Sequence, residues 1–207
     1  MGADLRAGLL SKPGWKTDDR RKLCWDRQSG TLHGVQVNTE GTSAYKRLGG
    51  FDPNRPWRLQ FDWRINGAAL WGGRAFGLFG PDMCWPDVAD VAGVQQLITD
   101  HGRGTSLAAH GLDAGGGARF DPHLELRTWC RHHLEYDPAS GILSLRTRLR
   151  SNGELFLEQQ MQVSEFSEDM NCLGGSRFHM KGTADSAEAR AAVDFDLDNI
   201  TLSEAAF

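Results

Sequence analysis

The chain has 207 residues and a formal net charge of −4, with acidic and basic residues mixed along its length. This length suits one domain over residues 1–207, since an all-β sandwich of this size is usually a single unit. No basic stripe occurs, which excludes general nucleic-acid binding as an expected function. No apolar run is long enough for a signal peptide or a membrane span, so an extracellular or periplasmic location requires that a leader has been removed.

The four cysteines are widely spaced and form no C-x-x-C pair, so the sequence does not predict a zinc site. They are Cys24, Cys84, Cys130 and Cys172. If oxidised, they allow three pairings, among which the sequence does not choose. Cys130 is in phase with the apolar side of its predicted strand, so we expect a buried thiol there.

The first clear strand is PWRLQFDWRI, residues 56–65. Apolar and polar residues alternate in it, as in an antiparallel strand with one face buried. The apolar face holds Trp57, Leu59, Phe61, Trp63 and Ile65. The stretch AFGLFG, residues 75–80, follows as a strand, and its internal glycine predicts the close approach of another backbone.

From Pro81 to Pro122 the strand pattern is interrupted. Several apolar residues within this excursion recur at helical spacing, which predicts a short helix. They are Val88, Val91, Val94 or Gln95, and Ile98. Long excursions in compact β domains are often functional, so we expect a loop with a short helix that walls or covers a neighbouring surface.

A hairpin is predicted from two alternating stretches, 124–136 and 142–150, joined by the turn DPASG. In the first stretch, parity directs Cys130, His132, Leu134 and Tyr136 inward. The opposite, polar side carries Glu125, Arg127, Trp129, Arg131, His133 and Glu135. Asn152-Gly153 predicts a further tight turn into the next strand. The last strand, 193–202, places Asp194, Asp196 and Asp198 on one side.

Many short strands with turns between them predict an all-β fold with two antiparallel sheets packed as a β-sandwich. The number of strands and the length favour a jelly roll.

The stretch WCRHHLEYDPASGILSLRTRL resembles the late hairpin of concanavalin A-like lectin/glucanase domains, including laminin G-like modules. WRLQFDWRI with FGLFG is similar to the earlier strand pair of the same superfamily, and FDLDNITL to its closing strand. The resemblance covers residues 25–80 and 122–203. It implies a jelly roll whose concave sheet binds glycan, sometimes with catalysis, and often a structural calcium ion. A shared fold alone does not establish an activity.

The polar side of the 124–136 strand has two interpretations. As a carbohydrate-binding surface, its indole would stack on a pyranose while arginine and glutamate side chains bind hydroxyl or carboxylate groups. As the solvated side of a sheet, its charges would pair across strands with Arg146, Arg148 and Arg150 or with the aspartates. Trp129 favours binding, because a large aromatic on a charged surface is costly to hydrate unless a ligand, or a loop such as the 81–122 excursion, covers it.

The aspartates of the last strand also allow alternatives: a solvated ion-pair ladder, calcium ligation by Asp196 and Asp198, or catalysis. Neighbouring members are about 6.5–7 Å apart, a spacing compatible with a pair of glycosidase carboxylates. Calcium requires oxygens from several segments, which one strand cannot supply alone. Glu125 and Glu135 are excluded as a catalytic pair, because ten residues of one straight strand would separate them by about 33 Å.

A polysaccharide lyase is the main catalytic alternative. The residues His123, Glu125, Leu126 and Arg127 resemble part of the Arg-Ser/Thr-Glu-Leu-Arg strand of alginate lyases, although the other signatures of those enzymes are absent. In such a scheme Arg127 and Arg131 would neutralise a uronate and His133 would move a proton. We therefore expect a module that binds a poly- or oligosaccharide without catalysis, with an enzyme or a laminin G-like adhesive module as the alternatives.

Overall fold

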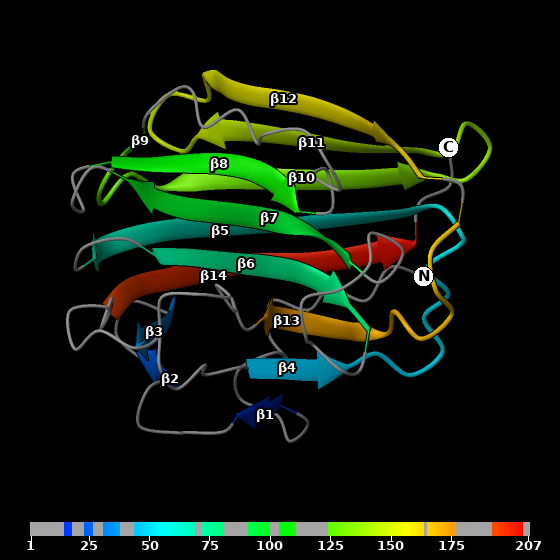
Figure 1. Ribbon diagram of the computed structural model, residues 1–207, viewed down its shortest axis with the longest axis horizontal. Coiled ribbons are helices and arrows are strands. Elements are labelled where there is room, and N and C mark those ends of the chain that lie inside the picture. The colour runs from blue at the N-terminus through cyan, green and yellow to red at the C-terminus, as the bar shows by residue number, and fades with distance from the viewer. Residues whose placement is uncertain are drawn as a thin grey trace, which may run out of the picture.

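The structure, a computed structural model, describes residues 15–17, 23–26, 31–37, 44–68, 72–80, 91–99, 104–110, 124–163, 165–176 and 192–204. These ranges contain no helix, and their strands form two antiparallel seven-stranded sheets (Figure 1). The predicted all-β sandwich is therefore confirmed.

Sheet A has the strand order β1-β4-β13-β6-β7-β8-β9. Its strands are β1 (Trp15–Thr17), β4 (Ala44–Arg47), β6 (Gly72–Phe79), β7 (Val91–Thr99), β8 (Gly104–His110), β9 (Leu124–Glu125) and β13 (Cys172–Ser176). Sheet B has the order β12-β11-β10-β5-β14-β3-β2. Its strands are β2 (Leu23–Asp26), β3 (Thr31–Val37), β5 (Trp57–Ala68), β10 (Cys130–Asp137), β11 (Ile142–Leu149), β12 (Leu155–Gln162) and β14 (Ala192–Glu204).

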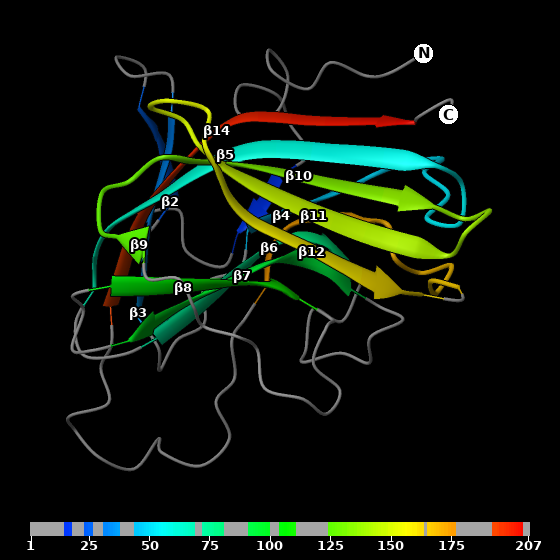
Figure 2. The same cartoon turned by 90° about the horizontal axis from the view of Figure 1, so that it is seen from above.

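The two sheets lie face to face and enclose an apolar core (Figure 2). The five apolar residues of β5 predicted to point inward, Trp57 to Ile65, are buried, as are Cys130, Leu134 and Tyr136 of β10. Ring contacts join the sheets: Phe61 of β5 lies 4.8 Å from Phe76 of β6 between ring centroids. The alternation read in the sequence thus assigns the inner face of sheet B correctly, because burial of one face imposes a period of two.

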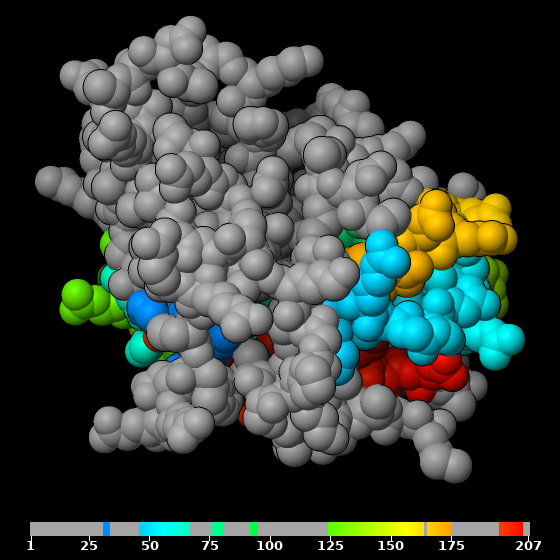
Figure 3. Space-filling view, turned by 90° about the horizontal axis from the view of Figure 1, so that it is seen from below, coloured from blue at the N-terminus to red at the C-terminus, as the bar shows by residue number. Residues whose placement is uncertain are grey.

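The loop between β12 and β13 closes one end of the core. Phe166 is buried there and its ring lies edge-on to Tyr136, with 4.7 Å between centroids. The side-chain amide of Asn54 makes two hydrogen bonds with the backbone of Phe166. Its Nδ2 donates to the carbonyl oxygen at 2.8 Å, and its Oδ1 accepts from the N–H at 2.7 Å. Figure 3 shows the consequence on the surface, where residues 46–56 and 165–174 lie against each other.

Glycines permit close contact between β6 and β7. Gly77 pairs with Gly93 in the antiparallel register. A Cβ built on Gly77 would lie 2.3 Å from the carbonyl oxygen of Ala92 and 2.4 Å from the Cα of Gly93. The close backbone approach predicted from AFGLFG is confirmed, and it explains why a side chain cannot be accommodated here.

The short helix predicted within 81–122 is wrong. Residues 91–99 and 104–110 of this excursion form β7 and β8, which extend sheet A. The spacing of Val91, Val94 and Ile98 fits a helix, but residues 91–99 pair in antiparallel register with β6 and β8, and the residues of this strand whose burial is described, 92–94, are all buried. Residues 81–90, 100–103 and 111–123 lie outside the described residues, so no cover by them is described.

The single strand predicted over 124–136 is also wrong. Leu124 and Glu125 form β9 at the edge of sheet A, whereas β10 of sheet B begins at Cys130. Between them Arg127 has a φ of 67°. This left-handed conformation reverses the chain, and the backbone N–H of Arg127 donates to the carbonyl oxygen of Ile65 at 2.6 Å. The chain therefore passes from one sheet to the other at residues 126–129.

Within the described part of the chain, no helix has the length and apolar character needed to cross a membrane.

Candidate functional site

The outer face of sheet B, here called the polar face, carries side chains that point away from the core from β3, β14, β5, β10 and β11. The antiparallel registers align them in rows across the strands. In the first row Arg64 of β5 lies opposite Asp196 of β14, which lies opposite His33 of β3. Arg150 extends this row beyond Trp129, to whose carbonyl oxygen its backbone N–H donates at 2.9 Å.

Trp129 lies between two arginines on the polar face. The guanidinium carbon Cζ of Arg64 is 4.7 Å from the centroid of the Trp129 ring, and that of Arg150 is 5.3 Å from it. Both distances are within the range of cation–π attraction. From the sequence we expected a ligand or a loop to cover this indole. In the structure, two guanidinium groups lie against it. Trp129 remains half-buried, so part of its ring reaches solvent.

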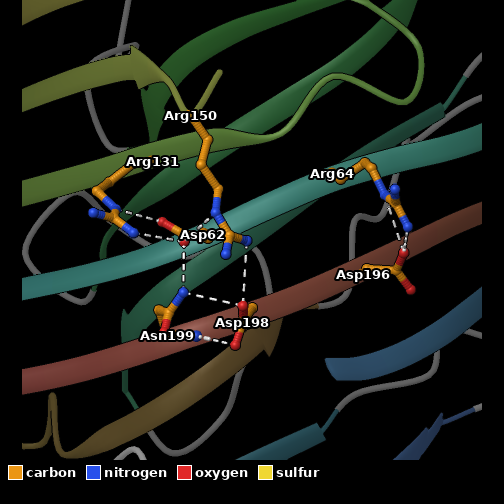
Figure 4. Close-up of polar contacts among 7 residues, drawn as sticks. All are labelled: Asp62, Arg64, Arg131, Arg150, Asp196, Asp198 and Asn199. Carbon is orange, nitrogen blue, oxygen red and sulfur yellow. Dashed lines mark hydrogen bonds and ion pairs between the residues drawn. The ribbon is translucent and has the colours of Figure 1, made fainter. Parts of the chain in front are cut away.

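The second row is centred on Asp62 of β5, which lies opposite Arg131 of β10. Arg131 binds Asp62 at two points, with Nε 2.7 Å from Oδ1 and Nη2 2.9 Å from Oδ2 (Figure 4). Arg150 approaches the same carboxylate, with its Nε 3.5 Å from Oδ2. Burial alone would raise the pKa of Asp62, but hydrogen bonds from Arg131 and Asn199 and the charges of both arginines outweigh it, so the pKa is lowered. Asp62 is therefore ionised although it is fully buried.

A bulge in β14 completes the surroundings of Asp62. The register with β5 shifts between Asp198 and Thr201, and Asn199 within the shift has a φ of 50°. The bulge directs the amide Nδ2 of Asn199 to Asp62 Oδ2 at 2.8 Å (Figure 4). Asp198 accepts from the backbone N–H of Asn199 at 2.7 Å and from Arg150 Nη1 at 3.3 Å. Asn199, which lies in the bulge, therefore donates to both Asp62 and Asp198, and Arg150 contacts the same two carboxylates.

Asp196 is enclosed by donors. Its Oδ1 lies 2.9 Å from Nδ1 of His33, and its Oδ2 accepts from Asn66 Nδ2 at 2.9 Å and from the guanidinium of Arg64. Burial would raise the pKa of Asp196, but hydrogen bonds from Arg64, Asn66 and His33 lower it overall. Both oxygens are directed at donors and not at an open position.

The predicted calcium site at Asp196 and Asp198 does not fit this arrangement. Calcium requires carboxylate and carbonyl oxygens that converge on a common point. Here the oxygens of Asp196 and Asp198 accept hydrogen bonds from arginine, asparagine and a backbone N–H. Among the residues described, no group of three or more His, Cys, Asp or Glu side chains is placed to hold a metal ion. Calcium elsewhere in the protein stays a prediction.

The opposite end of the polar face has balanced charge. Glu135 of β10 pairs with Arg58 of β5, whose Nε lies 2.5 Å from Oε1. Arg146 of β11 lies 4.0 Å from Glu135 Oε2, and its Nε lies 2.6 Å from Oε1 of Glu158 on β12. Two arginines thus face two glutamates, and Glu135 is part of an ion-pair network and not a free contact for a ligand.

His133 separates the two ends. It lies opposite Arg146 and Gln60 in the register, one row from Arg131 and Arg148. Burial is the main cause that lowers its pKa, and the charges of Arg131 and Arg148 lower it further, against Glu135 and Asp62. A neutral imidazole can accept or donate a hydrogen bond to a hydroxyl group without adding charge.

The six residues predicted for carbohydrate binding are thus only partly brought together. Trp129, Arg131 and His133 share the polar face, and Glu135 lies at its balanced end. Arg127 is exposed at the chain reversal, where its Nε lies 3.4 Å from the carbonyl oxygen of Asn66, next to the Trp129 end. Glu125 belongs to β9 of sheet A, so the strand assumed for the lyase scheme and for the 33 Å spacing is not formed.

The sequence interpretation overlooked four residues that organise this face. The alternation of apolar and polar residues did place Asp62 and Arg64 on the polar side of β5, but it gave no reason to predict them as site residues. Their importance follows from partners far along the chain: Arg131 and Asn199 for Asp62, Asp196 for Arg64. The other two are Asn199 and His33.

Comparisons with known proteins identify the fold and no closer relationship. No family model matches the chain, and no curated protein matches its sequence. Among solved structures, the alginate lyase Aly36B aligns with a TM-score of 0.56 and 14% identity over 97% of this chain and 91% of its own. The PL-14 alginate lyase from Aplysia kurodai aligns with a TM-score of 0.54 and 8% identity over 92% and 90%.

A lectin shows the same degree of similarity as the lyases. The winged bean acidic lectin, solved with methyl-alpha-D-galactose, aligns with a TM-score of 0.57 and 12% identity over 94% of each chain. At such identities the likeness concerns the path of the backbone and not the site. The chain therefore has the concanavalin A-like jelly-roll fold, as its strand patterns predicted.

Proposed function

We propose that the chain is a carbohydrate-binding β-sandwich that binds a poly- or oligosaccharide on its polar face without catalysing its cleavage. The observation that carries the proposal is the half-exposed Trp129 held between Arg64 and Arg150. An indole that reaches solvent beside guanidinium groups suits a glycan, because the ring can stack on a sugar while the guanidinium groups donate hydrogen bonds to its oxygens. Solved structures that share this fold include a lectin and alginate lyases, which supports a carbohydrate-related role.

Two carboxylates of the polar face, Asp62 and Asp196, are unsuited to act as the acid of a glycosidase. A glycosidase requires one carboxyl group that is protonated so that it can donate to the leaving oxygen. The pKa of Asp62 and that of Asp196 are both lowered by arginine partners. Both groups are therefore ionised near neutral pH and cannot serve as that acid.

A polysaccharide panel separates binding from catalysis. Purified protein is incubated with neutral and acidic polysaccharides, and new reducing ends and unsaturated uronates are measured. We expect neither product. Release of unsaturated uronates would establish a lyase, and release of reducing ends alone a hydrolase, and either result would replace the proposal.

A glycan array with two matched variants tests the binding itself. Trp129→Ala removes the indole from the polar face, whereas Leu155→Ala removes an apolar side chain that is 43% exposed on the edge strand β12. We expect the first variant to lose glycan binding and the second to retain it. Binding to no glycan, with retained adhesion to protein ligands, would favour the adhesive alternative instead.

A further inference from the structure

The Trp129 end of the polar face carries more arginine than carboxylate. Here this region is called the arginine cluster. Its members are Arg64, Arg127, Arg131, Arg148 and Arg150, and the carboxylates among them are Asp62, Asp196 and Asp198. Three of these five arginines form ion pairs with the three carboxylates, whereas at the balanced end each arginine pairs with a glutamate.

The carboxylates lie below the arginines. The side chain of Asp62 is 0% exposed, that of Asp196 is 7% and that of Asp198 is 23%. The side chains of Arg64, Arg131 and Arg150 are 32%, 38% and 40% exposed. A molecule that approaches this surface meets guanidinium groups first, because the neutralising charges are held beneath them.

Two arginines have no carboxylate partner among the described residues. Arg148 Nη1 donates to the carbonyl oxygen of Gly153 at 3.0 Å, and Arg127 Nε to that of Asn66 at 3.4 Å. Each guanidinium carries five N–H donors, so both retain donors for another partner. These two residues provide the excess positive charge.

The arrangement also places like charges together. Arg131 lies directly opposite Arg148 in the β10–β11 register. Like charges at opposed positions destabilise a sheet unless a counter-charge is present. Asp62 binds Arg131, whereas Arg148 has no carboxylate partner in the described part of the chain.

We infer that the arginine cluster recognises an acidic glycan, one that carries carboxylate or sulfate groups; this inference rests on the proposed function. Guanidinium groups bind both kinds of anion through paired N–H donors. Trp129 acts here as a positioning residue, because its ring fixes the guanidinium groups of Arg64 and Arg150 on a rigid sheet.

The spacing of the cluster fits a repeating anion better than a single one. Arg150 and Arg64 flank the strand of Trp129, so two interstrand spacings, about 10 Å, separate their strands. Arg148 lies in β11 and Arg150 directly follows its last residue, so about 7 Å of extended chain separates them. Charges distributed on this scale match successive substituents of a polysaccharide, whereas one small anion would contact one or two guanidinium groups.

The test compares two arginines of the same strand. Arg148→Gln removes an arginine that has no carboxylate partner within the described ranges, and Arg146→Gln removes one that pairs with Glu158 and Glu135. Both variants lose one positive charge from exposed positions on β11, and thermal melting verifies that both are folded. Calorimetric titration uses alginate and dextran sulfate as acidic probes, unmodified dextran as the neutral one, and single-stranded poly(dT) as a different polyanion.

The inference predicts that an acidic polysaccharide binds and dextran does not. Arg148→Gln should weaken that binding about tenfold, the loss of one charge-assisted contact, and Arg146→Gln less than twofold. Arg127→Gln provides a second variant with the same expected loss. Equal losses for Arg146→Gln and Arg148→Gln would overturn the inference, since net charge alone would then explain them.

The remaining outcomes separate this inference from the proposed function. Binding of dextran as tight as that of alginate would overturn the acidic specificity and leave glycan binding intact. Binding of no polysaccharide at all would overturn both. Tight binding of poly(dT) with the same Arg148 dependence, and without polysaccharide binding, would assign the cluster to nucleic acid and overturn the glycan assignment.

Discussion

Arg131 donates two hydrogen bonds to the carboxylate of Asp62 on the outer face of sheet B, and both nitrogen–oxygen distances are below 3 Å. The carboxylate is fully buried, whereas the guanidinium reaches solvent. This orientation has two consequences: the anion is available only to protein donors, and the surface presented to a ligand is cationic.

Asp62→Asn should destabilise the protein by about 2 kcal/mol. The substitution leaves Arg131 and Arg150 without their shared counter-charge, but both can reach water, so the loss stays below that of a fully buried pair. Asp52→Asn is the matched control, because Asp52 pairs with Arg55 at exposed positions and should contribute less than about 0.5 kcal/mol. Urea unfolding of the three proteins measures the difference; equal stabilities would contradict the role assigned to Asp62.

His132 should make stability depend on pH below neutrality. It is fully buried, its Nδ1 lies 2.9 Å from Thr147 Oγ1, and its Nε2 has no hydrogen-bond partner among the described residues. Burial is the main cause that lowers its pKa to about 3. The unfolded chain takes up a proton near pH 6.5, which the folded protein resists, so stability is complete above that pH and declines as the pH falls toward 3.

The expected slope for this one group is about 1.4 kcal/mol per pH unit. His133 also has a lowered pKa and contributes in the same direction. The measurement is therefore a comparison of unfolding free energies for wild type and His132→Leu between pH 7 and pH 4.5. The variant should show a shallower decline, and parallel curves would contradict the assignment.

Gly77→Ala should destabilise the sandwich by about 2 kcal/mol through overpacking. The added methyl group would collide with the backbone of Ala92 and Gly93 on β7, which cannot move without breaking the strand pairing. Gly49→Ala is the control, because a Cβ at Gly49 has no atom within 4 Å. Thermal melting of both variants tests the point, and similar melting temperatures would show that β6 and β7 are not so close.

Cys130 should resist alkylation in the folded protein. Burial, with the charge of Asp62 adding to it, raises the pKa of its thiol to about 12. The thiolate is the reactive form, so iodoacetamide at pH 8 should label Cys130 at least about a hundredfold more slowly than in urea. Mass spectrometry of the peptide that contains Cys130 provides the rate, and fast labelling under native conditions would exclude burial.

The strand faces of β5, β10 and β11 could be predicted because alternation is a local property of the sequence. The wrong prediction for β7 shows the limit of reading periodicity. Val91, Val94 and Ile98 satisfy a helical period, whereas Gly93, a poor helix former, argued against a helix. The chain reversal at Arg127 has no such signal, since a positive φ at a non-glycine residue is imposed by tertiary contacts.

The organisation of the polar face was less predictable than its position. Which charges are buried depends on partners that converge from distant segments, as Arg131 and Asn199 do on Asp62. The cover of Trp129 by Arg64 and Arg150 likewise depends on the register of three strands. The sequence could therefore predict which strand face carries polar and charged side chains. That arginines cover buried carboxylates on this face is evident only from the structure.

Hydroxyl-radical footprinting of the protein saturated with a bound glycan tests most directly whether the polar face is the binding surface. The account predicts that oxidation of Trp129 slows when the glycan binds, while oxidation of the exposed Leu155 on β12 does not change. Unchanged oxidation of Trp129 at saturating glycan would contradict it and would place the binding site elsewhere on the sandwich.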